Sequence, residues 1–158
     1  MNFVDIYKSM EGTLEKLTVG EVLKTNEESK KYGLVLTAEE ANVVIETRNL
    51  AIKNYGRVEL GIEVVKKIIA AFCTSPYINP QDYASTLNEL IEIFYYMKNE
   101  TEDRIGDDEL IGIMKEYFNN SCRGSAELLR NRELPLFAIN FRQQLNQVID
   151  FSLKEEQL

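Results

Sequence analysis

The sequence predicts an all-α protein, a single compact bundle of about seven helices around one long central helix at about residues 80–105. Apolar residues recur at spacings of three and four positions along nearly the whole chain, which is the period of an amphipathic helix. The chain has eight glycines and three prolines and few alternating patterns that would indicate strands. Its 158 residues, 44% of them hydrophobic, suit one domain with its own core, so we expect a single helical domain over 1–158.

The N-terminal elements are predicted from their apolar spacing. One helix is expected along the apolar stripe of residues 3–17. A second is expected from about residue 20 to residue 31, with Gly33 closing it. Residues 34–36 are all apolar and predict a short extended stretch between this helix and the next.

The next two helices have clear boundary signals. Thr37, followed three residues later by Glu40, is a capping box, and Gly56 is typical of a C-terminal cap, so a third helix is expected between them. The apolar positions of a fourth helix follow from residue 62. This helix is expected to end near Ser75, because a proline comes next.

The fifth helix is predicted to be the longest. Asn79 is a favoured N-cap, Pro80 suits the first helical position, and the apolar spacing continues to the residue before Gly106. Three later helical segments are expected to begin at Asp107, Ser125 and Pro135. The last of them carries an apolar stripe to Leu153, and its tail over 154–158 is expected to fray.

The absence of histidine excludes the commonest general base, imidazole metal ligands and every serine–histidine or cysteine–histidine nucleophile. Cys73 and Cys122 form no C-x-x-C pair, which predicts neither a disulfide framework nor a thiolate metal site. The net charge of −8 disfavours nucleic acid and anionic membranes as partners. With no apolar run of about 18 residues and no signal-peptide pattern, a cytoplasmic location is expected.

Acidic side chains form a stripe on the polar face of the predicted fifth helix. Glu89, Glu92, Glu100 and Asp103 could hold Mg²⁺ or Mn²⁺, since these hard cations take oxygen ligands. The two pairs resemble the E-x-x-E and E-x-x-D motifs of helical nucleotide pyrophosphohydrolases, although there the pairs lie on two neighbouring helices. We expect a solvated acidic face that binds no cofactor, because charge runs on a helix are normally solvated, and the metal site is the alternative.

The same helix carries apolar or aromatic groups all the way round its axis at Ile93, Tyr95, Tyr96 and Met97. Such a helix is either buried among its neighbours or covered by a partner. The first alternative makes it the central helix of the bundle. The second makes these four residues a binding patch for another protein or for a second copy of the chain.

Arg48 points along the apolar side of the third helix. A guanidinium there must pair with a carboxylate or hold an anion, because it stays charged and its unpaired burial costs several kcal/mol. Glu59, Glu63 or an acid of the fifth helix is the expected partner. An anion site at Arg48 is the alternative.

Three stretches, GLVLTAEEA, ETRNLAIKNYGRVELG and NELIEIFYYMKNETEDRIGDDELIGIMKEYF, resemble an uncharacterised family of small proteins from anaerobic Gram-positive bacteria, over about residues 20–130. The resemblance implies a bacterial cytoplasmic setting and no particular activity. We therefore expect a non-enzymatic protein that binds another protein or itself. A metal-dependent hydrolase of a nucleotide or other phosphate compound is the first alternative, and a small-anion sensor is the second.

Overall fold

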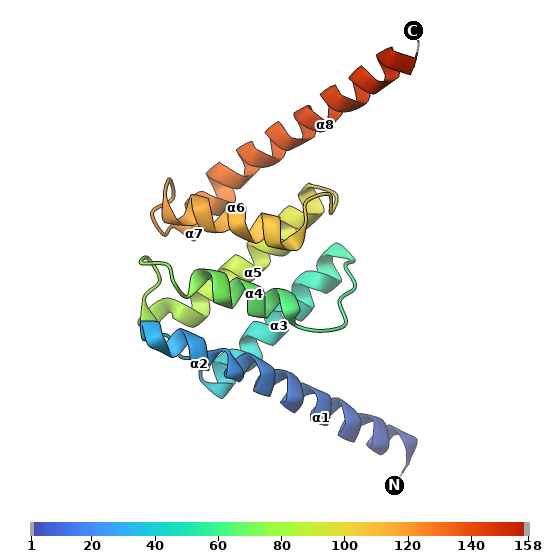
Figure 1. Cartoon of the computed structure of the whole chain (residues 1–158). Coiled ribbons are helices and arrows are strands. Elements are labelled where there is room, and N and C mark those ends of the chain that lie inside the picture. The colour runs from blue at the N-terminus through green and yellow to red at the C-terminus, as the bar shows by residue number, and fades with distance from the viewer. Residues whose placement is uncertain (1, 157–158) are drawn as a thin grey trace. The chain divides into compact units, whose positions relative to one another are not determined.

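The computed structural model describes residues 2–156, with only the backbone described at 6–15, 151–152 and 154–156 (Figure 1). Every regular element in the described residues is helical, which confirms the predicted all-α class. No helix among these residues is long and apolar enough to cross a membrane. The chain divides into two compact units, Met1–Glu92 and Ile93–Leu158, and the boundary falls within one helix. One domain over the whole chain stays a prediction.

The first unit is built from helices of very different length. α1 runs straight through Gly20, where a new helix was expected to start, since a single glycine costs a helix only about 1 kcal/mol. The chain turns at Gly33, whose φ of 77° is left-handed, as the sequence predicted. The helices of this unit are α1 (Phe3–Lys24), α2 (Asn26–Ser29), α3 (Ala38–Tyr55), α4 (Glu63–Phe72) and the first part of α5 (Tyr83–Glu100), with 3-10 turns at Lys30–Tyr32 and Pro80–Asp82.

Side-chain hydrogen bonds hold the connections of this unit. The side-chain Nδ2 of Asn26 donates to the carbonyl of Leu36, and its Oδ1 accepts from the Leu36 N–H, both at 2.9 Å. The stretch expected to be extended at 34–36 has no regular secondary structure, and Leu36 pairs with a side chain. The capping box of Thr37 and Glu40 is present at the start of α3, as predicted. Large apolar side chains fill the interior of the unit, among them Leu34, Leu36, Val44, Val65, Ile68, Phe72, Leu87 and Leu90.

The second unit contains the end of α5, α6 (Asp107–Asn119), α7 (Ala126–Leu128), a π-helical turn at Leu129–Glu133 and α8 (Leu134–Glu156). Ser125 caps α7 as predicted, because its hydroxyl accepts from the Leu128 N–H at 3.2 Å. The helical path then continues into α8. The Leu134 N–H donates to the carbonyl of Leu129, five residues back, immediately before Pro135, which has no N–H to donate. The last helix thus begins one residue before the predicted proline.

The fifth helix is shorter than predicted, because α5 ends at Glu100 and not at about residue 105. The Thr101 hydroxyl donates to the carbonyl of Met97 at 2.8 Å, and the Asp103 N–H donates to the carbonyl of Lys98 at 2.7 Å. Glu102 and Asp103 both take left-handed backbone angles, with φ of 55° and 57°. These bonds satisfy the last carbonyls of the helix and end it. The fifth helix was predicted to be the longest, but α1 and α8 are both longer than α5.

Candidate functional site

An apolar stripe runs along α8, and we call it the α8 stripe. At the start of α8, Leu134 and Ala138 are buried, at 1% and 2% exposed. Farther along the helix the side chains emerge, so that Val148 is 64% exposed and Leu153 is 53% exposed. In Figure 1 the helix continues beyond α6 and α7. The stripe comprises Phe137, Phe141, Leu145, Val148, Ile149 and Leu153.

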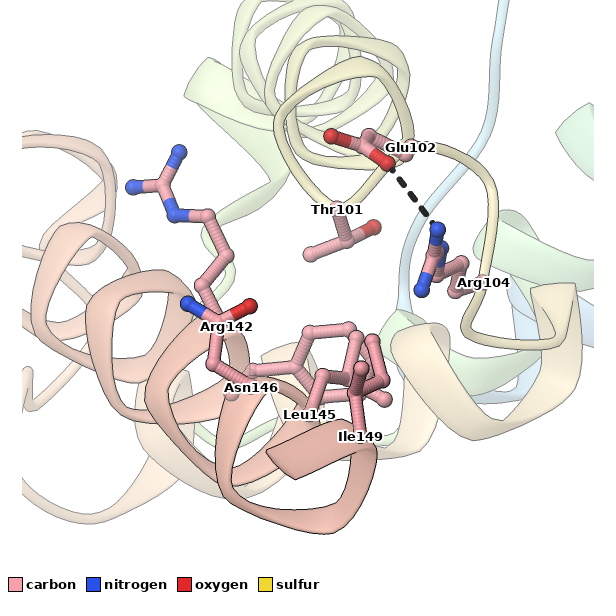
Figure 2. Close-up of a pocket in the computed structure, with 8 residues that line it drawn as sticks. Thr101, Glu102, Arg104, Arg142, Leu145, Asn146 and Ile149 are labelled. Carbon is pink, nitrogen blue, oxygen red and sulfur yellow. Dashed lines mark ion pairs between the residues drawn. The ribbon is translucent and has the colours of Figure 1, made fainter. Parts of the chain in front are cut away.

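A cavity of about 290 Å³ lies between the middle of this stripe and the turn that follows α5 (Figure 2). We call it the turn cavity. Phe141, Leu145 and Ile149 contribute its apolar wall, each one turn of α8 after the last. The remaining lining residues are polar or charged: Thr101, Glu102, Arg104, Arg142 and Asn146.

Two arginines from different elements stand on the rim of the turn cavity. The Arg104 Nη2 lies 3.4 Å from the Glu102 Oε2, and the Arg142 Nη1 lies 3.4 Å from the Glu100 Oε2. Both guanidinium side chains are about half exposed, at 49% and 47%. Ion pairs this long and this exposed contribute about 0–1 kcal/mol, so the two arginines are not committed to these partners.

A buried lysine shapes the turn that supplies one side of the cavity. Lys98 is 5% exposed, and its Nζ lies 2.6 Å from the Asp103 Oδ1 and 3.0 Å from the Asp107 Oδ1. The same ammonium donates to the carbonyl of Ile105. These bonds join the end of α5 to the start of α6. Lys98 was not among the predicted site residues, although its position four residues after Phe94, on the apolar side of the helix, is the same kind of signal that drew attention to Arg48.

A second cavity, of about 430 Å³, lies between α6 and the start of α8. Phe137 lines this cavity and Phe141 lines the turn cavity. The two rings are stacked, with centroids 6.2 Å apart and planes 21° from parallel. Hollows therefore flank the two aromatic residues of the α8 stripe. The other residues around the second cavity are Ile113, Glu116, Tyr117, Asn120 and Ser121.

Of the two acid pairs predicted as metal ligands, one lies on a single helix and the other does not. Glu89 and Glu92 are exposed on α5. Glu100 pairs with Arg142, and Asp103 pairs with Lys98. Asp103 lies in the turn because α5 ends at Glu100, so the pair expected three residues apart on one helix face does not exist. Among the described residues, no group of three or more acidic or cysteine side chains is arranged to hold a metal ion. Metal binding stays a prediction.

Most of the predicted partner-binding patch on α5 is buried. Ile93, Tyr95 and Met97 are each 1% exposed, and only Tyr96, at 37%, reaches solvent. Phe94 and Tyr95 meet edge to face, with ring centroids 5.0 Å apart. Burial of three of the four side chains agrees with the other interpretation of this segment, a helix packed among its neighbours. The prediction that these four residues form one exposed patch was therefore wrong, because three of them are buried.

Arg48 has the kind of partner that the sequence predicted. Its Nη2 lies 3.3 Å from the Glu59 Oε2 and also donates to the carbonyls of Glu59 and Gly61. Its Nη1 donates to the Asn49 side chain at 2.9 Å. Glu59 also accepts from Arg57 at 2.9 Å. The Nη1 and Nη2 groups of Arg48 are therefore used inside the first unit, while its buried Nε has no hydrogen-bond partner among the described residues. Anion binding at this residue stays a prediction.

Comparisons with known proteins identify a family without an assigned activity. No curated protein matches the chain, and no solved structure matches it. A family described only as being of unknown function, DUF6323, matches residues 21–147. This range contains the two stacked rings of the α8 stripe and all of the turn cavity except Ile149. An uncharacterised family was expected from the sequence, and the chain belongs to the DUF6323 family of unknown function.

Proposed function

We propose that this protein is a non-enzymatic bacterial cytoplasmic protein that works by binding a helix of another protein along the α8 stripe. One observation carries the proposal: the stripe keeps its helical spacing along α8, but its side chains become exposed toward the C-terminal end of the helix. Leu145 is half-buried, whereas Val148 and Leu153 are mostly exposed. Contiguous exposed apolar side chains of this kind commonly mark sites of protein interaction.

The geometry of the stripe favours a helical partner. From Phe137 to Leu153 the stripe spans 16 residues, or about 24 Å at about 1.5 Å per residue. Rows of side chains three and four positions apart pack between the matching rows of another helix. The hollow beside Phe137 is suited to a larger side chain of such a helix, as in other complexes in which a helix lies in a groove.

Site-specific photo-crosslinking in native cells tests this proposal. A photoreactive residue at Val148 or Leu153 is expected to give a discrete crosslinked product. The same residue at Gln143 or Gln147, exposed on the opposite face of α8, is the matched control and is expected to give none. Equal labelling from both faces, or no product from either, would contradict the proposal.

A second measurement separates partner binding from self-association. Light scattering of the purified chain is expected to give the mass of a monomer, so that the crosslinked product contains a different protein. The substitution Val148→Glu is expected to abolish the crosslink from Leu153, whereas Gln147→Glu adds the same charge on the other face and is expected to leave it unchanged. A dimer that Val148→Glu converts to monomer would replace the proposed partner with a second copy.

A further inference from the structure

We propose that the turn cavity binds a small organic acid, with its carboxylate between Arg104 and Arg142 and its apolar body against the α8 stripe. The inference goes beyond the proposed function and does not depend on it, because the exposed end of the stripe at Val148 and Leu153 lies outside the cavity lining.

The lining of the cavity has the two-part character of a site for an amphipathic ligand. Phe141, Leu145 and Ile149 form a continuous apolar wall from one face of α8. Arg104 comes from the turn and Arg142 from α8, and Figure 2 places them on opposite sides of the space. The volume, about 290 Å³, is at the small end of the range for ligand sites, which indicates a small molecule.

The N–H donors of the lining, and not its net charge, suit an anion. Each of the two arginines faces one glutamate, which gives 2 − 2 = 0 around the cavity. Each guanidinium presents a planar fork of N–H donors that matches a carboxylate. Among the side chains that the structure describes, Arg142 and Arg104 each have one partner, a carboxylate 3.4 Å away. Donors therefore remain for a ligand, and the bonds that it would replace are weak.

The apolar wall argues for an organic acid in preference to inorganic phosphate. Phosphate would leave Phe141, Leu145 and Ile149 in contact with water, whereas an aryl or alkyl group would cover them and gain the free energy of burial. Arg48, the anion site considered from the sequence, differs on this point. Glu59 and two carbonyl groups already occupy its guanidinium, so the turn cavity has the larger unused donor capacity.

Titration followed by NMR tests the inference on the full chain. The probes are 3-phenylpropionate and hexanoate, with 3-phenylpropionamide as the neutral analogue and inorganic phosphate as the anion without an apolar body. The two acids are expected to bind with Kd values of about 0.1–1 mM and to shift the signals of Leu145 and Ile149. The amide and phosphate are expected to bind at least about tenfold more weakly, since each lacks one half of the recognised chemistry.

Variants locate the binding. Arg104→Gln and Arg142→Gln are each expected to weaken 3-phenylpropionate binding by about tenfold or more. Arg123→Gln removes the same charge from an exposed arginine outside the cavity lining and is expected to leave the Kd unchanged. Circular dichroism spectra identical to that of the native chain are required of all three variants. If circular dichroism shows that an arginine variant is misfolded, Arg104→Lys and Arg142→Lys, which keep the charge and lose the fork, replace it.

Three outcomes would overturn the inference: no binding of either acid at about 10 mM, equal binding of acid and amide, or equal weakening by Arg123→Gln. Binding of a peptide that ends in an acidic residue, with no binding of the free acids, would also overturn it and would assign the arginines to the protein partner. None of these outcomes bears on the crosslink from Val148, so the inference and the proposed function fail separately.

Discussion

The guanidinium of Arg48 and the carboxylate of Glu59 lie 3.3 Å apart, with their side chains only 12% and 10% exposed. Arg57 approaches the other oxygen of the same carboxylate at 2.9 Å. Glu59 thus lies between two cations and connects the loop after α3 to the helix itself. The charge that stood out in the sequence, on the apolar side of a helix, is paired as electrostatics requires.

Glu59→Gln is expected to lower the free energy of unfolding by about 3–5 kcal/mol, because it removes the carboxylate that Arg48 and Arg57 share in a place that water scarcely reaches. Urea unfolding measures the effect. Glu46→Gln, on the exposed face of α3, is the control and is expected to change the stability by less than about 0.5 kcal/mol. Equal stability of the two variants would mean that Glu59 does not hold the loop.

Lys98→Met is expected to destabilise the protein by about 1–3 kcal/mol. The cost is smaller than that of losing Glu59, because Asp103 and Asp107 are 70% and 28% exposed and regain water when the ammonium is removed. Hydrogen exchange should rise mainly at the turn between α5 and α6. Lys53→Met, on the surface of α3, serves as the control, and unchanged exchange at the turn in Lys98→Met would contradict the role assigned to this lysine.

Burial raises the pKa of Tyr83 from 10.0 to about 12, with the nearby Ser29 hydroxyl acting in the opposite direction. The folded state therefore holds this proton more tightly than the unfolded state. Its contribution to stability is complete below about pH 10 and is lost as the pH rises from about 10 to about 12. Unfolding temperatures measured across this window should fall more steeply for the native chain than for Tyr83→Phe. Parallel curves would exclude a role for Tyr83.

Mg²⁺ and Mn²⁺ are expected to leave the unfolding temperature unchanged, in line with the expectation that the protein has no metal cofactor. Glu100 and Asp103, two of the four acids considered, already pair with Arg142 and Lys98. A specific ligand at 100 times its Kd would stabilise the chain by about 2.7 kcal/mol, or about 5–15 °C for a protein of this size. A shift of that size that Glu92→Gln abolishes would put the metal-dependent hydrolase in place of the binding protein as the leading function.

Local signals predicted the local structure well. The capping box at Thr37 and the left-handed turn at Gly33 are present because each depends on only a few neighbouring residues. The expected end of the fifth helix was wrong because the apolar spacing continues past Glu100. The chain leaves the helix where Thr101 and Asp103 donate hydrogen bonds to its last carbonyls, and the apolar spacing does not reveal that preference.

The candidate site was predictable only in its parts. The apolar stripe of the last helix was evident from the sequence, and so was the need of Arg48 for a partner. The sequence did not reveal which apolar side chains remain exposed. The buried Ile93, Tyr95 and Met97 were therefore grouped with Tyr96 as a binding patch. The turn cavity was also missed, because it joins residues about 40 positions apart in the chain, such as Arg104 and Arg142.

The sequence by itself determined the all-α class, most helix boundaries and the amphipathic character of α8, because helical period and capping are properties of neighbouring residues. The tertiary structure alone decided which apolar faces are covered. It also decided which acid pairs with Arg48 and Lys98, and that a cavity with two arginines opens beside Phe141. Burial and ion pairing depend on side chains that are distant along the chain, and packing brings these together in ways that no local pattern encodes.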